Sequence, residues 1–352
     1  MKPEDLVGRL LGGRYRIERL IGSGGFGAVY KATHVALARP VAIKTCLHAS
    51  PAMHARFVQE ARLQARLRHP RCVTLLEFGE EPDGIFYMVQ EFVEGQNLSQ
   101  ILRTHGPLAP GRALAVTAEV LDALHAAHRL GVVHRDIKPS NVMLTRDIDD
   151  QEEVRLIDFG IAKAVEETVE GESLTHTGAM LGTPSYMAPE QIRHEPIGPT
   201  TDLYAVGAML YRLCAGHGPF DAPFGYEILR MHLFEPPPSL PFHAPALDAV
   251  IARAMAKAPA DRYPSAQAMR AAIEALDGLD GIGSITMSER TLDDALPPGM
   301  RPAPTDGTLT NARGEIDPAS RPTSPRPGRR AAVIALVALA AALVFWPTAP
   351  PP

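Results

Sequence analysis

The sequence has few cysteines, and they form no pattern that binds metal or builds a disulfide framework. Cys46, Cys72 and Cys214 are far apart and include no CxxC pair. A sparse, odd number of cysteines argues against structural zinc and disulfides and fits a reducing compartment. We therefore expect three small, partly buried side chains.

An excess of basic charge is also absent. The formal net charge is -5 at pH 7, and aromatic residues make up only 6% of the chain, without the aromatic and basic alternation that stacks bases. Nucleic-acid binding is therefore disfavoured. The first residues, MKPEDLVGRL, contain no long apolar run, so we expect no secretory signal peptide.

Residues 13 to about 93 contain short runs that alternate apolar and polar residues, as strands do; examples are RYRIERLIG, GAVYKATH, RPVAIKTCL and IFYMVQEFV. One helical stretch, HARFVQEARLQARLRHP, interrupts them and stops at Pro70. The apolar residues expected near one face of this helix are Phe57, Val58, Ala61 and Ala65. Residues 94 to about 277 are predicted to be mostly helical, so the sequence indicates an α+β protein in two lobes.

The composition changes after the last predicted helix. Residues 278–330 are rich in Gly, Pro, Ser and Thr, which predicts a flexible linker. Residues 331–346, AAVIALVALAAALVFW, carry no charge, although a membrane helix needs roughly 17 to 25 residues. The preceding RPGRR and the terminal Trp346 favour a single membrane helix with its N-terminal side in the cytoplasm. A buried core helix is the alternative.

A glycine-rich stretch, IGSGGFGAVYKA, places Gly22, Gly24 and Gly27 in G-x-G-x-x-G-x-V spacing. Glycines let the backbone approach phosphates and present N–H donors to them. In a dinucleotide-binding fold such glycines open a helix, and an acidic residue follows about 20 residues later. Here the next residues alternate like a hairpin, and the residue 20 positions after Gly24 is Lys44. A dinucleotide-dependent oxidoreductase is therefore disfavoured, and a plain tight turn remains open.

Two charged residues lie in apolar surroundings. Lys44, in VAIK, needs a negative partner, and a ligand phosphate together with Glu60 of the predicted helix would supply it. Asp158, in RLIDFGIAK, follows an apolar pair at the end of a predicted strand, where a carboxylate can hold a hard cation such as Mg²⁺. The alternatives are a lysine that reaches solvent, an ordinary surface glutamate and a common Asp-containing turn.

The stretch VVHRDIKPSN combines groups suited to phosphoryl transfer. Asp136 can accept a proton from an attacking hydroxyl, Lys138 can steady the transferred group, and Asn141 offers an oxygen to a metal ion. Each motif alone has a plain structural alternative, but all four in this order are not a chance combination. Over residues 13–277 the sequence resembles the protein kinase family, and residues 174–191, LTHTGAMLGTPSYMAPEQ, are similar to bacterial kinases of the eukaryotic type.

The resemblance implies a two-lobed protein kinase fold with a strand-rich N-lobe of about 13–93 and a helical C-lobe of about 94–277. It implies a Ser/Thr protein kinase that transfers the ATP γ-phosphoryl group to protein hydroxyls with Mg²⁺, or alternatively Mn²⁺. The expected partners are protein substrates, the chain itself as a homodimer in autophosphorylation, and the membrane, with no nucleic acid. The expected location is the cell membrane, crossed once, with a cytoplasmic kinase domain.

The resemblance also assigns site residues. For catalysis it implies Lys44, Glu60, Asp136 and Lys138, and for the metal it implies Asn141 and Asp158. For the nucleotide it implies Ile21, Gly22, Ser23, Gly24, Gly25, Phe26, Gly27, Val29, Ala42, Lys44, Glu91, Val93 and Met143. It further implies that Glu190 pairs with a buried Arg262 and that Asp202 steadies the catalytic loop.

The family resemblance implies a switch in the loop from Asp158 to Glu190. Arg135, beside the catalytic Asp, is typical of kinases whose loop needs an anionic partner, and Thr175 and Thr177 occupy the expected phosphorylation positions. Thr183 is assigned to the substrate site instead. A pseudokinase scaffold is the rival interpretation, and the presence of every expected catalytic residue argues against it.

The chain departs from the family at two positions. The family alignment puts Gln90 at the gatekeeper position behind adenine, where an apolar residue or Thr is usual, and Gln64, four residues after Glu60, at a position that is usually apolar. Two polar residues in one apolar region are expected to hydrogen-bond each other, unless the alignment is shifted by one residue or Gln64 reaches solvent.

Overall fold

The structure, a computed structural model, describes residues 2–24, 27–46, 51–147, 149, 151–159 and 184–276. The chain divides into two compact units, Met1–Ser288 and Glu289–Pro352, and the second lies wholly outside the described residues. The expected linker and membrane helix, residues 278–346, therefore fall outside what the structure describes. Within the described part, no helix is both long and apolar enough to cross a bilayer.

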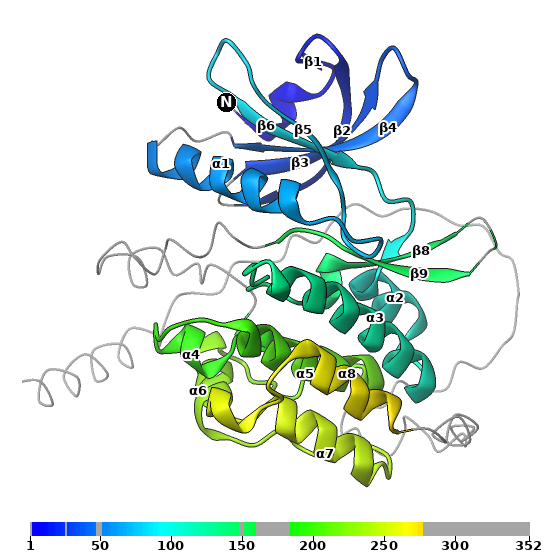
Figure 1. Ribbon diagram of the computed structural model, residues 1–352, viewed down its shortest axis with the longest axis vertical. Coiled ribbons are helices and arrows are strands. Elements are labelled where there is room, and N and C mark those ends of the chain that lie inside the picture. Colours follow the sequence, from blue (N-terminus) through cyan, green and yellow to red (C-terminus); the bar gives the residue numbers. More distant parts are fainter. Residues whose placement is uncertain are drawn as a thin grey trace, which may run out of the picture. The chain divides into compact units, whose positions relative to one another are not determined.

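A six-stranded antiparallel sheet forms the N-terminal lobe, in the order β1-β2-β3-β4-β6-β5 (Figure 1). Its strands are β1 (Leu10–Leu11), β2 (Tyr15–Gly24), β3 (Gly27–His34), β4 (Arg39–Cys46), β5 (Leu75–Glu80) and β6 (Phe86–Glu91), preceded by the short helix η1 (Pro3–Leu6). The four strands expected from alternation are therefore confirmed as β2, β3, β4 and β6.

The sheet buries a different set of residues on each face, because successive side chains of a strand point to opposite sides. In β6, Tyr87 and Val89 join a core with Ile43 of β4, whereas Met88 packs with Phe57 of helix α1 (Pro51–Arg66) on the other face. Helix α1 therefore packs its Phe57 side against the face of the sheet that carries Met88 (Figure 1).

The four apolar residues expected near one face of α1 differ in burial. Phe57 and Ala61 are buried and Val58 is half-buried, but Ala65 is exposed, and its neighbour Gln64 is buried. The helix turns about 100° per residue, so the buried stripe includes the polar residues Glu60 and Gln64 and leaves Ala65 outside.

Helices dominate the C-terminal lobe, which also contains a three-stranded sheet in the order β7-β8-β9 (Figure 1). Its elements are β7 (Gln96–Asn97), α2 (Leu98–His105), α3 (Pro110–Arg129), η2 (Pro139–Asn141), β8 (Val142–Arg146), β9 (Glu152–Leu156), η4 (Pro184–Tyr186), α4 (Pro189–Ile192), α5 (Pro199–Ala215), α6 (Gly225–Phe234), α7 (Pro245–Ala254), η5 (Pro259–Asp261) and α8 (Ala266–Glu274). Helix α5 is buried along most of its length and packs against α3 and α7, so it forms the centre of this lobe.

Local sequence signals explain where the helices begin and end. Helices α3, α5 and α7 each begin with proline, whose fixed φ suits the first helical position. At the start of α2, the Asn97 side chain accepts a hydrogen bond from the Gln100 backbone, and the Gln100 side chain bonds back. Helix α5 ends at Gly216, which adopts a left-handed conformation with φ 83°.

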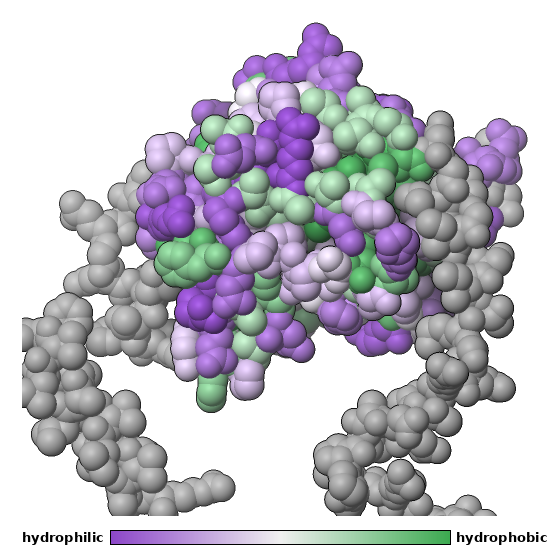
Figure 2. All heavy atoms as spheres, turned by 90° about the horizontal axis from the view of Figure 1, so that it is seen from below, coloured by the Kyte–Doolittle hydropathy of each residue, from purple (hydrophilic) through white to green (hydrophobic). Residues whose placement is uncertain are grey.

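Both lobes keep their apolar side chains largely inside. All three cysteines are buried and free, more deeply than the expected partial burial. Figure 2 shows the molecule from below, where hydrophobic areas alternate with hydrophilic ones. The large hydrophobic residues exposed around α6 are Phe224, Tyr226 and Phe234.

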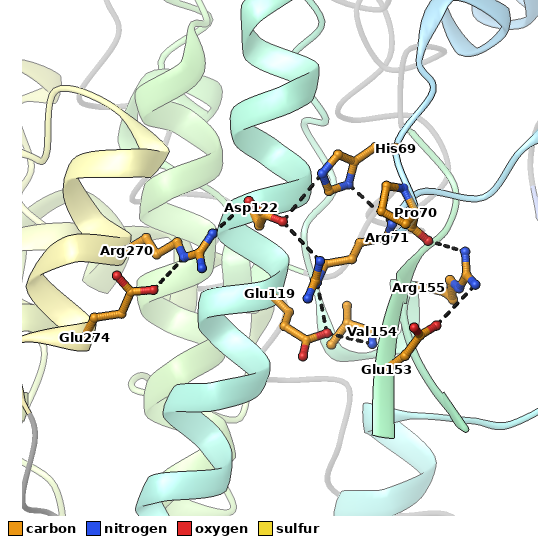
Figure 3. Close-up of polar contacts among 10 residues, drawn as sticks. All are labelled: His69, Pro70, Arg71, Glu119, Asp122, Glu153, Val154, Arg155, Arg270 and Glu274. Carbon is orange, nitrogen blue, oxygen red and sulfur yellow. Dashed lines mark hydrogen bonds and ion pairs between the residues drawn. The ribbon is translucent and has the colours of Figure 1, made fainter. Parts of the chain in front are cut away.

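The segment between α1 and β5 is fastened to the C-terminal lobe by side chains (Figure 3). Arg71 Nε lies 3.1 Å from a Glu119 carboxylate oxygen of α3, and its Nη1 lies 3.2 Å from Asp122 of the same helix. Asp122 also accepts a hydrogen bond of 2.8 Å from Arg270 of α8. The α1–β5 segment and α8 therefore both contact α3 through the carboxylate of Asp122.

Backbone hydrogen bonds hold the same segment to β9. The Leu156 N–H donates to the Arg71 carbonyl at 2.7 Å, and the Val73 N–H donates to the Leu156 carbonyl at 3.1 Å. Because Asp158 follows two residues after Leu156, the α1–β5 segment is fixed close to the start of the loop that runs from Asp158 to Glu190.

A buried ion pair supports the helical lobe from within. Arg262 is fully buried and donates two hydrogen bonds of 2.7 Å to Glu190, as expected from the sequence, and Thr201 donates a third. Burial alone would raise the pKa of Glu190, but the hydrogen bonds and charge of Arg262 lower it below the ordinary 4.5. A carboxyl with a lowered pKa stabilises the fold above its ordinary pKa, and that contribution is lost as the pH falls below 4.5 and through the folded-state pKa.

We predict that Arg262→Met lowers the free energy of unfolding by roughly 3–5 kcal/mol, because it leaves the Glu190 carboxylate buried without its cation. Urea denaturation of the full chain at pH 7 measures the change. The acid-induced loss of stability below pH 4.5 should also be smaller in the variant than in the wild type.

Arg270→Met is the matched control, since its side chain is 40% exposed and its ion pair with Asp122 lies at the surface. A loss of less than about 1 kcal/mol is expected there. Equal losses in the two variants would contradict the role assigned to the buried pair.

Candidate active site

The glycine-rich stretch includes the end of β2 and the start of β3, where Gly24 pairs with Gly27. A side chain at Gly27 would place its Cβ 1.8 Å from the Thr45 carbonyl oxygen, and its φ of 154° is rare for other residues. Glycine at this position therefore lets β3 start against β4. The expected nucleotide residues Gly25 and Phe26 lie outside the described residues.

Lys44 and Glu60 are brought together by β4 and α1. Lys44 Nζ lies 2.6 Å from Glu60 Oε1, and Glu60 is only 2% exposed. Burial by itself would lower the pKa of Lys44, but the carboxylates of Glu60 and Asp158 outweigh this effect and raise it. The lysine is therefore an ammonium ion at neutral pH, held in one place.

Asp158, in the C-terminal lobe, lies close to the same lysine. Its Oδ1 lies 3.9 Å from Lys44 Nζ, and its side chain is 37% exposed. Asp158 has a φ of 53°, a conformation that non-glycine residues rarely adopt. Such strain occurs where the surrounding structure fixes the backbone.

The catalytic residues expected in the loop before β8 cluster around Asp136. Lys138 Nζ donates to Asp136 Oδ2 at 2.8 Å, and Asn141 Nδ2 donates to the Asp136 carbonyl at 2.8 Å and to Oδ2 at 3.2 Å. A carbonyl can only accept, so the amide nitrogen of Asn141 faces Asp136. The amide oxygen of Asn141 is therefore not the atom that contacts Asp136.

Asp202 of α5 holds the backbone of this loop. Its carboxylate accepts the N–H groups of His134 at 2.8 Å and Arg135 at 2.7 Å, and it contacts His128 Nε2 at 2.8 Å. These bonds support the left-handed φ of 65° at Arg135. The position of Asp136 thus depends on the central helix of the C-terminal lobe, in which Asp202 itself is buried.

His134 contributes to the same support as a neutral ring. Burial lowers the pKa of His134, because a charged imidazole in this buried position would not be hydrated. Its Nε2 lies 3.2 Å from the Ile157 carbonyl, and its Nδ1 accepts the Asp136 N–H at 3.3 Å. The ring therefore connects the residue before Asp158 with Asp136.

The remaining expected nucleotide residues lie on adjacent strands. Val29 of β3 is paired with Lys44, Ala42 of β4 with Gln90, and Glu91 ends β6. The others follow the same arrangement, with Ile21, Gly22, Ser23 and Gly24 on β2, Val93 just after β6 and Met143 on β8 of the C-terminal lobe.

The expected pairing of Gln90 and Gln64 is confirmed. Gln90 Nε2 donates to Gln64 Oε1 at 2.8 Å, and both side chains are buried. Gln64 therefore does not reach solvent, and a polar contact joins β6 to α1 behind the strand that carries Ala42.

The oxygen atoms near Lys44 fit a divalent cation. Within the part of the chain described, no cluster of three or more His, Cys, Asp or Glu side chains could hold a metal alone. Asn141 and Asp158 would instead supply one oxygen ligand each, and the Asn141 carbonyl accepts the Ile157 N–H at 3.0 Å, next to Asp158. Mg²⁺ commonly takes one or two protein ligands and completes its shell with waters and phosphates.

A hollow of about 530 Å³ lies elsewhere, between α2 and the sheet β7-β8-β9. It includes the ion pair between Arg112 and Glu152, 2.6 Å apart, and contains none of the expected catalytic or nucleotide residues. We assign the chemistry to the residues around Lys44 and Asp136, because the charged groups converge there.

The comparison with protein families decides what this arrangement is. The model of the protein kinase domain matches residues 15–271. The chain belongs to the protein kinase domain family. The two-lobed fold with a strand-rich N-lobe and a helical C-lobe, expected from the sequence, is therefore confirmed.

The kinase domain has relatives among bacterial Ser/Thr kinases, which confirms that expected resemblance. It is 40% identical over 283 residues to the serine/threonine-protein kinase pkn3 of Myxococcus xanthus, covering 78% of this chain and 52% of pkn3. It is 38% identical over 304 residues to PknB of Mycolicibacterium smegmatis, covering 83% of this chain and 48% of PknB. The chain thus spans about half the length of these relatives.

Solved structures agree with the fold of the kinase domain. The crystal structure of the PknI kinase domain of Mycobacterium tuberculosis matches with a TM-score of 0.56 at 27% identity, covering 77% of this chain and 99% of the PknI domain.

Sequence reasoning missed several residues that support the kinase site. His128 contacts Asp202, and Arg71 fastens the segment that follows α1. Neither lies in a catalytic motif, and each acts through a partner distant in sequence, so no local signal could have found them. Thr175, Thr177 and Thr183, which the sequence did single out, lie outside the described residues.

We predict that Asp136→Asn lowers the turnover number for phosphoryl transfer by roughly 10²–10⁴, because an amide cannot accept the hydroxyl proton. The change is nearly isosteric, so the ATP affinity and the melting temperature should stay close to those of the wild type. Steady-state kinetics with labelled ATP measure the loss. Wild-type turnover in the purified variant would contradict the assignment of Asp136.

Proposed function

We propose that this chain is an active Ser/Thr protein kinase that transfers the γ-phosphoryl group of ATP to hydroxyls of protein substrates. The ion pair of Lys44 and Glu60, with Asp158 beside it, is the observation that supports the proposal most directly. A pseudokinase scaffold has no need to keep Lys44, Asp136 and Asn141 together, and all of these groups are present.

In this proposal the N-lobe binds and orients ATP. The Lys44 ammonium binds phosphate oxygens, and the β2–β3 turn, with Gly22 and Gly27, covers them with backbone N–H donors. Adenine lies between Ala42 and Met143 and bonds to the backbone of Glu91 and Val93. Apart from Gly25 and Phe26, the expected nucleotide residues occupy described positions on β2, β3, β4, β6 and β8 or, for Val93, just after β6, and these positions agree with this arrangement.

The C-terminal lobe supplies the groups that act on the hydroxyl. Asp136 accepts the proton of the attacking Ser or Thr, and Lys138 stabilises the transferred group through its charge. Asn141 and Asp158 hold Mg²⁺ against the phosphates, and the ion offsets the negative charge that gathers there. Lys138 and Asn141 both donate hydrogen bonds to the Asp136 carboxylate, which keeps it in one orientation.

The activation loop is proposed to switch this site through Arg135. Among the described residues, no carboxylate pairs with the Arg135 guanidinium, although its backbone is held by Asp202 and Gln191. A phosphate on Thr175 or Thr177 carries about -1.5 to -2 charges and can take a bidentate bond from an arginine. The chain would phosphorylate itself there, with two copies meeting as a homodimer.

The domain organisation is part of the proposal. The kinase domain covers about residues 13–277, a flexible linker 278–330 follows, and residues 331–346 cross the cell membrane once, with the kinase domain in the cytoplasm. The uncharged run, the RPGRR before it and Trp346 support this reading.

The kinase function and its switch are tested together by comparing phosphatase-treated and untreated full-length protein, with γ-labelled ATP and a general protein substrate. The untreated kinase should label serine and threonine at once, whereas the treated kinase should show a lag while the loop regains its phosphates. Thr175→Ala combined with Thr177→Ala should lower the rate strongly, and each single change should lower it less.

The outcomes separate the proposal into two parts. Label found only on tyrosine, or no transfer at all, would exclude the Ser/Thr kinase function. Equal initial rates without a lag would exclude the switch and leave the kinase function standing. Thr291→Ala, in the linker, is the control and should not change the rate.

The proposed membrane helix is tested by fractionating cells. Full-length protein should remain in the membrane fraction after washing with high salt, because a spanning helix is held by apolar burial. A chain ending at Arg330 should be released, and Leu339→Arg should weaken retention, since a charge at a helix centre costs roughly 2.5–3.5 kcal/mol. Wild-type protein found wholly in the soluble fraction would contradict the anchor.

A further inference from the structure

Two buried glutamines connect α1 to the strand that leads to the adenine site. Gln64, on α1, is 3% exposed, and Gln90, on β6, is 5% exposed. Their side-chain amides share a hydrogen bond of 2.8 Å. An apolar pair would fill such a region without any need for partners, so the polar pair calls for a physical explanation.

The hydrogen bonds of this pair run in one direction. Gln64 Nε2 donates to the carbonyl oxygen of Val73 at 3.4 Å, and Gln64 Oε1 accepts from Gln90 Nε2. The Val73 carbonyl can only accept, so Gln64 must present its nitrogen there and its oxygen to Gln90. Reversing either amide would oppose like groups, and the pair therefore has one arrangement.

Both partners of Gln64 belong to elements that are fixed independently of α1. Gln90 is paired with Ala42 of β4 on one side and with Leu75 of β5 on the other. Val73 donates its N–H to Leu156 of β9, and Arg71, two residues earlier, is held by Glu119 and Asp122 (Figure 3). A shift of α1 therefore moves Gln64 relative to both of its partners.

Gln64 follows Glu60 by four residues, which places the two side chains on the same face of α1, one turn apart. Any rotation of α1 that withdraws Glu60 from Lys44 also separates Gln64 from Gln90. The separated amides would lie in a dry region, where an unpaired donor or acceptor is strongly unfavourable.

We propose that Gln64 and Gln90 are positioning residues, an amide latch that keeps α1 where Glu60 holds Lys44. The latch favours the competent arrangement of the kinase before ATP binds. The inference rests on the role proposed above for Lys44 and Glu60, and it adds a regulatory element that the catalytic motifs do not contain.

The test begins with methionine, which matches glutamine in length and lacks the amide. Gln64→Met and Gln90→Met should each lower kcat/KM for ATP roughly tenfold, because each leaves one buried amide without its partner. The double variant Gln64→Met/Gln90→Met should return to within about threefold of the wild type, because an apolar pair leaves nothing unpaired. Gln59→Met is the matched control on the same helix; Gln59 is exposed, and no change is expected.

A second cycle distinguishes positioning from a general loss of stability. In a Glu60→Gln background, Gln64→Met should have less than about a twofold further effect on kcat/KM, because the group through which it acts is already changed. A merely structural role would give the full roughly tenfold effect again. All proteins are compared full-length and in the same phosphorylation state, checked by mass spectrometry.

Several outcomes overturn the latch. Single variants with wild-type kcat/KM would do so, as would a double variant no better than the weaker single variant, or a full effect in the Glu60→Gln background. If Gln64→Met does not fold at the assay temperature, Gln90→Met and the double variant carry the same comparison. Full activity of Glu60→Gln itself would instead overturn the proposed role of the Lys44–Glu60 pair.

Discussion

The ion pair between Lys44 and Glu60 is the constraint on which the rest of the site depends. It joins a strand of the sheet to a helix whose Phe57 and Ala61 pack against Met88 of that sheet. A buried carboxylate without its cation is very unfavourable, so the pair restricts α1 to few positions. The apolar packing is not directional, whereas the polar contacts at Glu60 and Gln64 require one orientation of the helix.

The C-terminal lobe holds the loop that carries the Asp136 carboxylate in a fixed position. Asp202 accepts two backbone N–H groups of the catalytic loop, and the central helix α5 that carries it is almost wholly buried. The left-handed backbone at Arg135 is stabilised by these contacts. The two lobes meet at the 3.9 Å contact of Lys44 with Asp158 and in the segment around Arg71, so the alignment of the site depends on both connections.

Much of this could be predicted from the sequence, because the motifs combine local backbone signals with charged residues in apolar settings. The alternation that gave β2, β3, β4 and β6 is one example, and the pairing of Glu190 with Arg262, which the family resemblance implied, is another. Contacts made by charged residues outside the motifs were not predictable. Asp122 joins Arg71 and Arg270, which lie about 50 residues before it and about 150 residues after it, through an ordinary surface charge pattern. The exposure of Ala65 was not predictable from the apolar pattern of α1, because the buried stripe of this helix includes the polar residues Glu60 and Gln64.

The most direct test of this account is a crystal structure of the phosphorylated protein with Mg²⁺ and a non-hydrolysable ATP analogue. The account predicts that Glu60 keeps its contact with Lys44, that Lys44 touches a phosphate oxygen, and that Asn141 and Asp158 share the metal ion. A bound nucleotide whose phosphates lie away from Lys44, or a metal ion held without Asp158, would contradict it.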